Sequence, residues 1–301
     1  MKAPFPSFTS EWHNDTYDAI SPTSPSLSVK GRSIVITGGG AGIGRETAKA
    51  YAEAGAAQVA ILGRTQKTLS ESKSIIEAQS PATKVTTHIV DVADEETVGK
   101  TATEIGGWDV LILNAGVGSA PTTIEKSNLG HWWRAYETNV KGIVVCAQAF
   151  LPSRKPSASI IGINAGMVNV PVNFGAAVGH SAYTSSKMAQ LKVVEYLAAE
   201  VPDAFIASVH PGIVETDLMR AWDPEAIRSG TRERSHTVPI DDVKLPAHFI
   251  LWMTSPEAQF LHGKFVWCNW DVEQLKARAK EIQESQVLTS NVIGWPFEPQ
   301  A

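Results

Sequence analysis

Cysteine is nearly missing from this sequence, whose 301 residues include only Cys146 and Cys268, far apart in the chain. Two isolated cysteines cannot build a disulfide framework, and they do not stand at the spacing of a metal-binding motif. The sequence therefore indicates a reduced, cytoplasmic setting and no metal site. Both cysteines are expected to be small, buried, apolar side chains.

Long apolar runs and an excess of positive charge are also absent. No run approaches the roughly 18 residues that a membrane-spanning helix needs, and residues 1–31 lack the apolar core of a signal peptide. Lysine and arginine number 26 against 31 aspartates and glutamates, which gives a net charge of −5 and a pI of 5.9. A nucleic-acid surface would need a basic face. We therefore expect neither a membrane nor a nucleic acid among the partners.

The residues that are present suit one large globular domain. Hydrophobic residues make up 43% of the chain, which is ample for a single core. Residues 1–29 are rich in serine, proline and threonine and predict an irregular N-terminal extension. Residues 30–271 are expected to form the domain. Residues 272–301 are expected to form a charged helix, capped by Asp271, and a tail.

Short β-branched apolar runs alternate with segments of helical spacing along the domain. Strands are expected near 33–38, 58–62, 84–90, 109–114, 158–164, 205–210 and 263–270, and helices near 43–55, 66–78, 94–105, 128–151 and 182–200. Apolar strands that alternate with helices predict an α/β fold with a Rossmann-like, doubly wound, mostly parallel sheet covered on both faces.

The region after the sixth expected strand is less regular. Residues 215–240 are polar and mixed, and an irregular segment beside strand ends predicts a lid over a substrate pocket. A further helix follows, with Asp241 or Asp242 as its expected cap.

A glycine-rich segment, TGGGAGIG (37–44), joins the first expected strand to the first helix. Glycine permits the tight turn, lets a diphosphate approach the main chain, and precedes helical N–H groups that attract anions. The spacing GxGxxG does not occur, but TGxxxGxG does, at Thr37, Gly38, Gly42 and Gly44. A tight loop without a ligand is the competing interpretation. The position between a strand and a helix favours a dinucleotide site.

Four further motifs accompany this loop: NAG (114–116), TNVKG around Asn139, Tyr183-x-x-x-Lys187 and HPGIVET (210–216). Their order and spacing resemble those of the short-chain dehydrogenase/reductase family, over about residues 32–271. The resemblance implies a seven-stranded sheet. It also implies a nicotinamide cofactor along the carboxyl ends of the strands, where open α/β sheets generally bind ligands.

The resemblance also implies which residues hold the cofactor. The diphosphate would be held by the glycine loop, at Thr37, Gly38, Gly42, Ile43 and Gly44. Asp91 and Val92 would lie beside the adenine ring, Asn114, Ala115 and Gly116 under the middle of the cofactor, and Pro211, Gly212, Val214 and Thr216 beside the nicotinamide. For Asp91, a helix or turn cap is the alternative.

The end of the second strand bears on the choice of cofactor. An acidic side chain there usually accepts a hydrogen bond from the ribose hydroxyl of NAD, whereas arginine attracts the 2′-phosphate of NADP. In this sequence Gly63 stands at the position of the acid and Arg64 follows it. The sequence therefore favours NADP(H), with a solvated surface arginine as the alternative.

Tyr183 and Lys187 stand four residues apart, which places them on one face of a helix. The resemblance implies that Tyr183 exchanges a proton with the substrate and that Lys187 also holds the nicotinamide ribose. A free tyrosine has a pKa near ~10, which a neighbouring ammonium and an oxidised nicotinamide ring would lower. Asn139 matches the residue that holds a water in the family's proton relay.

The serine that completes the family's active site has no counterpart. Asn164 and Ala165 align with the usual pair of serines, and no serine or threonine follows until Ser181. Three explanations remain open. In the first, the amide of Asn164 or Asn169 substitutes as a donor to the substrate oxygen. In the second, Ser181 or His180 does so, and in the third the chemistry has changed. We favour the first, which makes Asn164 a candidate catalytic residue.

The leading hypothesis is an NADPH-dependent oxidoreductase that reduces a ketone or aldehyde, with Tyr183 as the proton donor. The apolar loop 166–180 favours a small, largely apolar organic substrate. One alternative is a non-redox isomerase or lyase that uses Tyr183 as acid or base, and another is a non-catalytic NADPH-binding protein. The resemblance also implies a homodimer or homotetramer.

Overall fold

The computed structural model describes residues 3–4, 6–118, 120–173, 177–220 and 240–292. Most of the expected lid, residues 221–239, lies outside the described residues.

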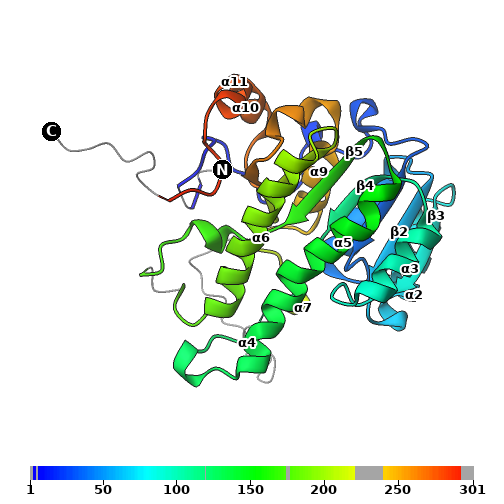
Figure 1. The fold of residues 1–301 in the computed structure, drawn as a ribbon. Helices are drawn as coiled ribbons and strands as arrows, with labels where there is room; N and C mark the ends of the chain where they lie inside the picture. Colours follow the sequence, from blue (N-terminus) through cyan, green and yellow to red (C-terminus); the bar gives the residue numbers. More distant parts are fainter. Residues whose placement is uncertain (1–2, 5, 119, 174–176, 221–239, 293–301) are drawn as a thin grey trace.

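Seven strands form one sheet in the order β3-β2-β1-β4-β5-β6-β7, and each pair of neighbours is parallel (Figure 1). The strands are β1 (Ser33–Thr37), β2 (Gln58–Gly63), β3 (Lys84–Ile89), β4 (Trp108–Leu113), β5 (Arg154–Ile163), β6 (Phe205–His210) and β7 (Phe265–Trp267). The predicted doubly wound parallel sheet is confirmed. Because all strands run the same way, their carboxyl ends meet at one edge.

Helices cover both faces of the sheet, which explains why the central strands are apolar on both sides. One face is covered by α1 (Gly42–Glu53), α2 (Gln66–Gln79) and α9 (Lys244–Met253), and the other by α3 (Glu95–Ile105), α5 (Gly142–Phe150) and α6 (Ser181–Glu200). Tyr51 and Phe249 are fully buried in the first layer, and Phe150 is fully buried in the second. The sheet therefore separates two hydrophobic cores, one on each face.

The helix predicted over residues 128–151 is interrupted. It consists of α4 (Leu129–Tyr136), a π-helical turn (Glu137–Lys141) and α5. The side chain of Asn128 caps α4 by accepting the backbone N–H of His131 at 3.0 Å. A π-helical turn holds one more residue than an α-helical turn, and such turns are frequent at functional sites. This turn contains Asn139.

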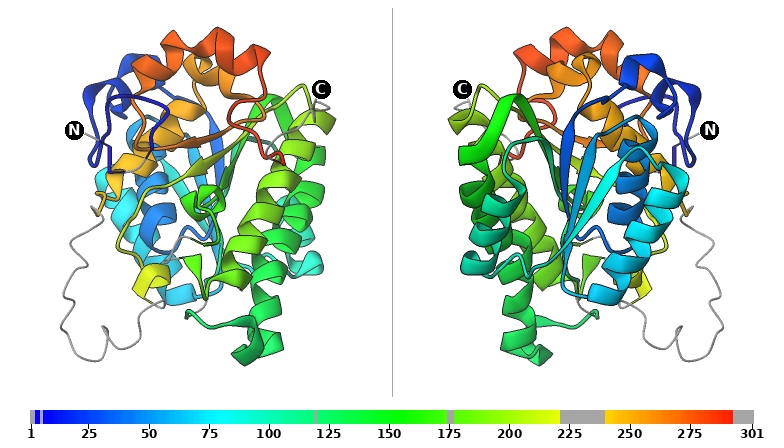
Figure 2. Two further views of the ribbon diagram at one scale, coloured as in Figure 1. Left: turned by 90° about the vertical axis from the view of Figure 1, so that its left-hand side faces the viewer. Right: turned by 90° about the vertical axis from the view of Figure 1, so that its right-hand side faces the viewer.

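The N-terminal extension packs on the domain through Trp12, Ile20 and Leu27, which are buried in the first core. It includes two short 3₁₀ turns, at Asp18–Ile20 and Pro25–Leu27. Both views in Figure 2 place this segment beside the residues that follow α9. The charged C-terminal segment forms α10 (Val272–Ala277) and α11 (Ala279–Glu284), and Asp271 caps α10 by accepting the N–H of Gln274 at 2.9 Å.

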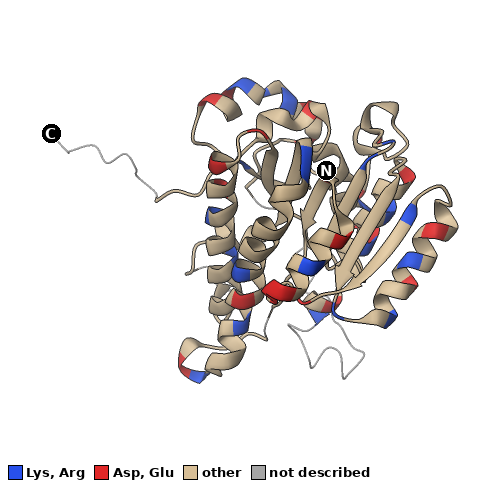
Figure 3. Cartoon of the chain, turned by 45° about the vertical axis from the view of Figure 1, so that its right-hand side comes forward, with Lys and Arg blue, Asp and Glu red and all other residues tan. Residues whose placement is uncertain are grey.

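Charge is mixed in the view of Figure 3, where acidic and basic residues are interspersed along the helices.

Both cysteines are free and buried, as predicted. Among the described residues, no helix is both long and apolar enough to cross a membrane. One further short helix, α7 (Asp217–Arg220), follows the loop after β6.

Candidate active site

Reciprocal hydrogen bonds join the carboxyl ends of β1 and β4. The hydroxyl of Thr37 accepts from the backbone N–H groups of Asn114 (2.9 Å) and Ala115 (3.0 Å). The amide of Asn114 donates in return to the carbonyls of Thr37 (2.9 Å) and Gly38 (3.2 Å). The strand order reverses between β1 and β4, and the crevice at such a point is where open α/β sheets bind ligands.

The glycine loop packs so closely that side chains would not fit. Gly38 has a φ of +69°, and a Cβ on it would lie 2.7 Å from Nδ2 of Asn114. A Cβ on Gly44 would overlap the carbonyl oxygen of Gly38. Gly42 begins α1, and Ile43 packs against the first core. The free N–H groups at this helix start are suited to a diphosphate.

Arg64 follows β2, and Asp91 follows the neighbouring β3. Nη1 of Arg64 lies 3.9 Å from Oδ2 of Asp91, and the two side chains are 62% and 46% exposed. The other carboxylate oxygen of Asp91 accepts the N–H of Ala93 at 3.0 Å, which is the turn cap considered as an alternative. Val92 is buried. The guanidinium is therefore held at this edge by a weak, solvent-screened ion pair.

The loop after β6 contains the predicted nicotinamide residues Pro211, Gly212, Val214 and Thr216. It passes close to the glycine loop, since a Cβ on Gly42 would lie 3.1 Å from Cγ2 of Thr216. Gly212 has a φ of +74°, and Val214 forms an isolated parallel bridge with Asp241. Residues predicted at two different parts of the cofactor thus meet at one edge of the sheet.

Tyr183 and Lys187 lie on α6, and their side chains are almost fully buried. Nζ of Lys187 is 5.9 Å from the centre of the Tyr183 ring. It donates to the carbonyl of Ile163, at the end of β5, and to Oε1 of Gln190, each at 2.8 Å. A Cβ on Gly116 would lie 3.5 Å from the same Nζ. The predicted pair therefore adjoins both the NAG motif and the end of β5.

Asn139 is fully buried and uses its whole side-chain amide within the protein. Its Oδ1 accepts the N–H of Val117 at 2.9 Å, and its Nδ2 donates to the carbonyl of Val117 and to Oγ of Ser186, each at 3.0 Å. Ser186 donates on to the carbonyl of Tyr183 at 2.8 Å. This side chain fixes the loop after the NAG motif against α6. Because the Asn139 side chain is engaged, a water of the proton relay would have to bind to the main chain of the π-helical turn instead.

Asn164 is also engaged within the protein. Its Nδ2 donates to the carbonyl of Lys187 at 3.0 Å, and its Oδ1 accepts the N–H of Ala165 at 2.8 Å. The amide that we predicted as a donor to the substrate oxygen therefore joins β5 to α6. The reason is geometric, because the end of β5 lies directly against α6 and a short amide there reaches the helix backbone.

The other candidates for the missing hydroxyl are held at the same side of the domain. Oδ1 of Asn169 accepts from Nε1 of Trp267 at 3.1 Å. Oγ of Ser181 accepts from Nε1 of Trp132, on α4, also at 3.1 Å. This hydrogen bond engages the side-chain oxygen of Asn169 and not its amide N–H groups. Amide N–H groups are the donors that a substrate oxygen requires.

Burial dominates the electrostatics of the central pair. It lowers the pKa of Lys187 from 10.5 to about 7. It raises the pKa of Tyr183 above its ordinary value, whereas we predicted that the ammonium would lower it. The difference arises because taking an ionisable group out of water disfavours its charged form. A free tyrosine is already protonated at neutral pH, so burial reinforces the state that a proton donor needs.

The burial of Lys187 predicts a pH-dependent contribution to stability. Since its folded pKa is about 7 and its ordinary value is 10.5, the unfolded chain binds more protons within that window. The free energy of unfolding should therefore rise as the pH increases from about 7 towards 10, and it should level off below about 7, where Lys187 is protonated in both the folded and the unfolded state. The variant Lys187→Met should lack this increase. Urea unfolding at several pH values measures it.

The control for this experiment is Lys192→Met, on the same helix. Lys192 is exposed and pairs with Glu195, so its replacement should keep the increase of stability with pH. Parallel stability profiles for the wild type and Lys187→Met would contradict a buried, depressed lysine.

Three residues in this network were not identified from the sequence. Ser186 and Gln190 follow Tyr183 and Lys187 by three residues each, so helical spacing could have found them. The third, Asp241, contacts the loop after β6. Its partners are distant in the sequence, and no local pattern pointed to them.

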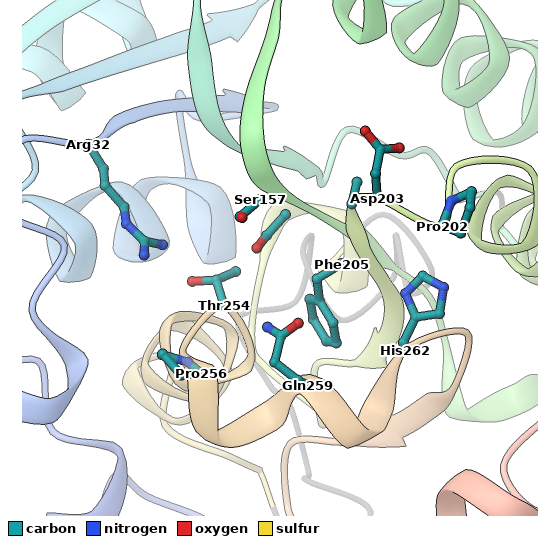
Figure 4. Close-up of a pocket in the computed structure, with 11 residues that line it drawn as sticks. Arg32, Ser157, Pro202, Asp203, Phe205, Thr254, Pro256, Gln259 and His262 are labelled. Carbon is teal, nitrogen blue, oxygen red and sulfur yellow. The ribbon is translucent and has the colours of Figure 1, made fainter.

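A cavity of about 360 Å³ lies at the opposite edge of the sheet, where the strands begin (Figure 4). It is lined by residues that include Arg32, Ser157, Phe205, Thr254, Gln259 and His262. Helices α6 and α9 end beside it, and helix C-termini carry partial negative charge. A diphosphate is disfavoured there, so the glycine loop remains the candidate cofactor site.

Comparison with known proteins gives a consistent result. A sequence model described as "short chain dehydrogenase" matches residues 32–226. The short chain dehydrogenase mpl6 of Monascus purpureus is 30% identical over 293 residues, which cover 94% of this chain and 96% of that protein. A short chain dehydrogenase/reductase of Claviceps purpurea is 31% identical over 290 residues, which cover 95% of this chain and 94% of that protein.

Solved structures share the fold. L-sorbose reductase of Gluconobacter frateurii, complexed with NADPH and L-sorbose, has a TM-score of 0.68 at 22% identity and covers 80% of this chain and 96% of its own. A short chain dehydrogenase of Burkholderia cenocepacia J2315, in complex with NADP, has a TM-score of 0.69 at 24% identity and covers 82% of this chain and 99% of its own. At these identities the similarity concerns the fold alone.

Proposed function

Because this chain belongs to the short-chain dehydrogenase/reductase family of oxidoreductases, we propose that it reduces a ketone or aldehyde with NADPH as the hydride donor. The observation that carries the proposal is the buried Tyr183–Lys187 pair, which adjoins the NAG motif, and this motif in turn packs against Gly38 of the glycine loop. The substrate is a small, largely apolar organic carbonyl compound, in keeping with the apolar loop 166–180.

The choice of NADPH rests on the end of β2. Gly63 provides no carboxylate to repel a 2′-phosphate, and Arg64 offers an exposed guanidinium whose existing partner is only a 3.9 Å ion pair. A dianionic phosphate would compete well for such a cation. The complexes of two structural relatives with NADPH and NADP agree with this choice.

The chain's own residues would divide the work as follows. The diphosphate of the cofactor would be held by the glycine loop, at Thr37, Gly38, Gly42, Ile43 and Gly44. The adenosine end would be held by Arg64, Asp91 and Val92, and the middle of the cofactor by Asn114, Ala115 and Gly116. The nicotinamide end would be bordered by Pro211, Gly212, Val214 and Thr216. NADPH supplies a hydride to the carbonyl carbon when bound. Tyr183, which is protonated at neutral pH and lies buried, would give its proton to the carbonyl oxygen.

Lys187 and the asparagines would position this donor. Lys187 is anchored by Ile163 and Gln190, so its Nζ is fixed one helical turn from the phenol. Asn139 fixes the loop after the NAG motif, and Asn164 fixes the end of β5 against α6. With Ala165 at the place of the usual serine, the amide of Asn169 is the candidate second donor to the substrate oxygen.

The proposal is tested by following NADPH absorbance with the purified wild type and a panel of apolar ketones, aldehydes and quinones. We expect oxidation of NADPH that depends on a carbonyl compound, with sugars as poor substrates. Conversion of a substrate without oxidation of NADPH would indicate a non-redox reaction instead. Binding of NADPH without any conversion across the panel would contradict the proposed reductase.

We further propose that the chain forms a homodimer or homotetramer through α5 and α6. These helices cover the same face of the sheet, and they expose the apolar side chains of Val144, Met188 and Tyr196. The last is 63% exposed, so it has apolar surface available to a partner subunit. Light scattering should give a mass of two or four times 32.3 kDa. A mass of 32.3 kDa, unchanged by Tyr196→Glu, would contradict the interface.

A further inference from the structure

The N-terminal arm, defined here as residues 9–16, contacts the domain at two segments that are far apart in the sequence. Trp12 pairs with Trp270 in an antiparallel bridge. The backbone N–H of His13 donates to the carbonyl of Asn269, and the Asn269 amide donates to the carbonyl of His13, each at 2.9 Å. The arm lies before residue 32, where the match to the family begins.

The second place of contact is the segment that precedes α9. The carbonyl of Asn14 accepts the N–H of Asp242 at 2.8 Å, and Nδ2 of Asn14 donates to Oδ1 of Asp241 at 2.5 Å. The sequence predicted Asp241 or Asp242 as the cap of this helix, but the N-cap of α9 is Val243, without a side-chain capping bond. Oδ1 of Asp242 accepts the N–H of Lys244 at 2.8 Å, and Asp241 turns into the protein and is 5% exposed.

Asp241 holds the loop after β6. Its Oδ2 accepts the N–H of Ile213 at 2.6 Å, and its own N–H donates to the carbonyl of Ile213 at 2.9 Å. A Cβ on Gly212 would overlap the same Oδ2, so the carboxylate fits directly under the turn. These contacts fix the backbone of Gly212 to Val214, which the proposed function places beside the nicotinamide.

The carboxylate of Asp241 has no cation within ion-pair distance among the described residues. Its burial is offset by three N–H donors instead: Ile213 on Oδ2, and Asn14 and Asn269 on Oδ1. A buried carboxylate is costly unless such donors are complete. Asn14 therefore supplies one of the three donors, and it lies before residue 32, where the match to the family model begins.

We infer that Asn14 is a positioning residue for cofactor binding, acting through Asp241 on the loop Gly212–Val214. The inference rests on the proposed function for the identity of the cofactor. Loss of the Asn14 donor leaves Oδ1 of Asp241 with a single partner, so the carboxylate and the backbone that it holds become less ordered. The N-terminal arm thereby forms part of the cofactor site without touching the cofactor.

The test uses the full chain with the variants Asn14→Ala, Asn14→Asp and Thr16→Val. Asn14→Ala removes one donor, and Asn14→Asp faces Asp241 with a second carboxylate. Thr16→Val is the matched control. The Thr16 hydroxyl forms a hydrogen bond with Nδ1 of His248 at 2.6 Å, so its loss should loosen the same arm at a different contact.

Two measurements are made on each folded variant: hydrogen exchange of the peptide containing Ile213 in the free protein, and the Kd and KM for NADPH. Asn14→Ala should speed hydrogen exchange at Ile213 and raise the Kd and KM for NADPH about fivefold. Asn14→Asp should have larger effects on the same quantities. In both variants kcat should stay within about twofold of the wild type. Thr16→Val should leave both readouts near the wild type, even if its melting temperature falls.

Wild-type exchange and NADPH affinity in both Asn14 variants would overturn the inference, and so would equal changes in Thr16→Val. The exchange measurement needs no cofactor. Faster exchange at Ile213 in a protein that does not bind NADPH would therefore refute the proposed function and leave the link between the arm and the loop intact.

Discussion

Replacing Tyr183 by phenylalanine should lower kcat for carbonyl reduction by roughly 10²–10⁴-fold, the usual contribution of a positioned acid or base. The change removes one hydroxyl and keeps the ring, so the packing of α6 against the sheet is retained. The buried phenol is the proposed donor of a proton to the carbonyl oxygen, so its removal leaves that step without its acid. Steady-state kinetics with NADPH and the best carbonyl substrate measures the effect.

The matched control is Tyr51→Phe, which removes a buried hydroxyl that bonds Oγ1 of Thr254 at 2.9 Å, on the first core and away from the carboxyl edge. This variant should lose stability but keep kcat. The affinity of Tyr183→Phe for NADPH should stay near that of the wild type. A kcat in Tyr183→Phe within about threefold of the wild type would exclude Tyr183 as the proton donor.

Replacing Arg64 by alanine should raise the KM for NADPH about 10- to 50-fold while changing that for NADH little. The reason is that the 2′-phosphate would lose a charge-assisted hydrogen bond, and NADH carries no such group. The expected rise in KM is moderate because the Arg64 side chain is 62% exposed and its interactions are screened by water. The ratio of kcat/KM for the two cofactors is the quantity to compare.

Two companion variants sharpen this result. Lys67→Ala removes a neighbouring cation on the first turn of α2 and should change the cofactor ratio much less than Arg64→Ala. Asp91→Asn removes the carboxylate 3.9 Å from Arg64 and should favour NADPH by about two- to threefold. Equal losses for NADPH and NADH in Arg64→Ala would rule out its role at the 2′-phosphate.

The sequence predicted the sheet and the meeting of its motifs because both follow from local patterns. Apolar runs of strand length that alternate with helical segments leave few arrangements other than a parallel sheet. Thr37 ends β1, Asn114 follows β4 and Thr216 lies in the loop after β6, so the parallel strands bring these separated residues to one edge of the sheet. Helical spacing likewise placed Tyr183 and Lys187 on one face.

The polar contacts inside the site were harder to predict because a residue type does not specify its partner. An asparagine at the end of β5 is equally suited to a substrate oxygen or to a helix carbonyl, and Asn164 takes the carbonyl of Lys187. The pKa of Tyr183 depends on its burial, which the spacing of two residues does not reveal. Asn14 and Asp241 stand 227 residues apart, so no local pattern connects them.

The π-helical turn Glu137–Lys141 sets the rotation of α4 about its axis. Each residue of an α-helix turns the chain by about 100°, so the extra residue in this turn offsets α4 from α5 by about that angle. In this orientation Nε1 of Trp132 reaches Oγ of Ser181, at the start of α6. A chain one residue shorter here would continue as a regular helix, and its tryptophan would swing away from Ser181. The length of a five-residue segment thus determines which side chains of α4 face the start of α6.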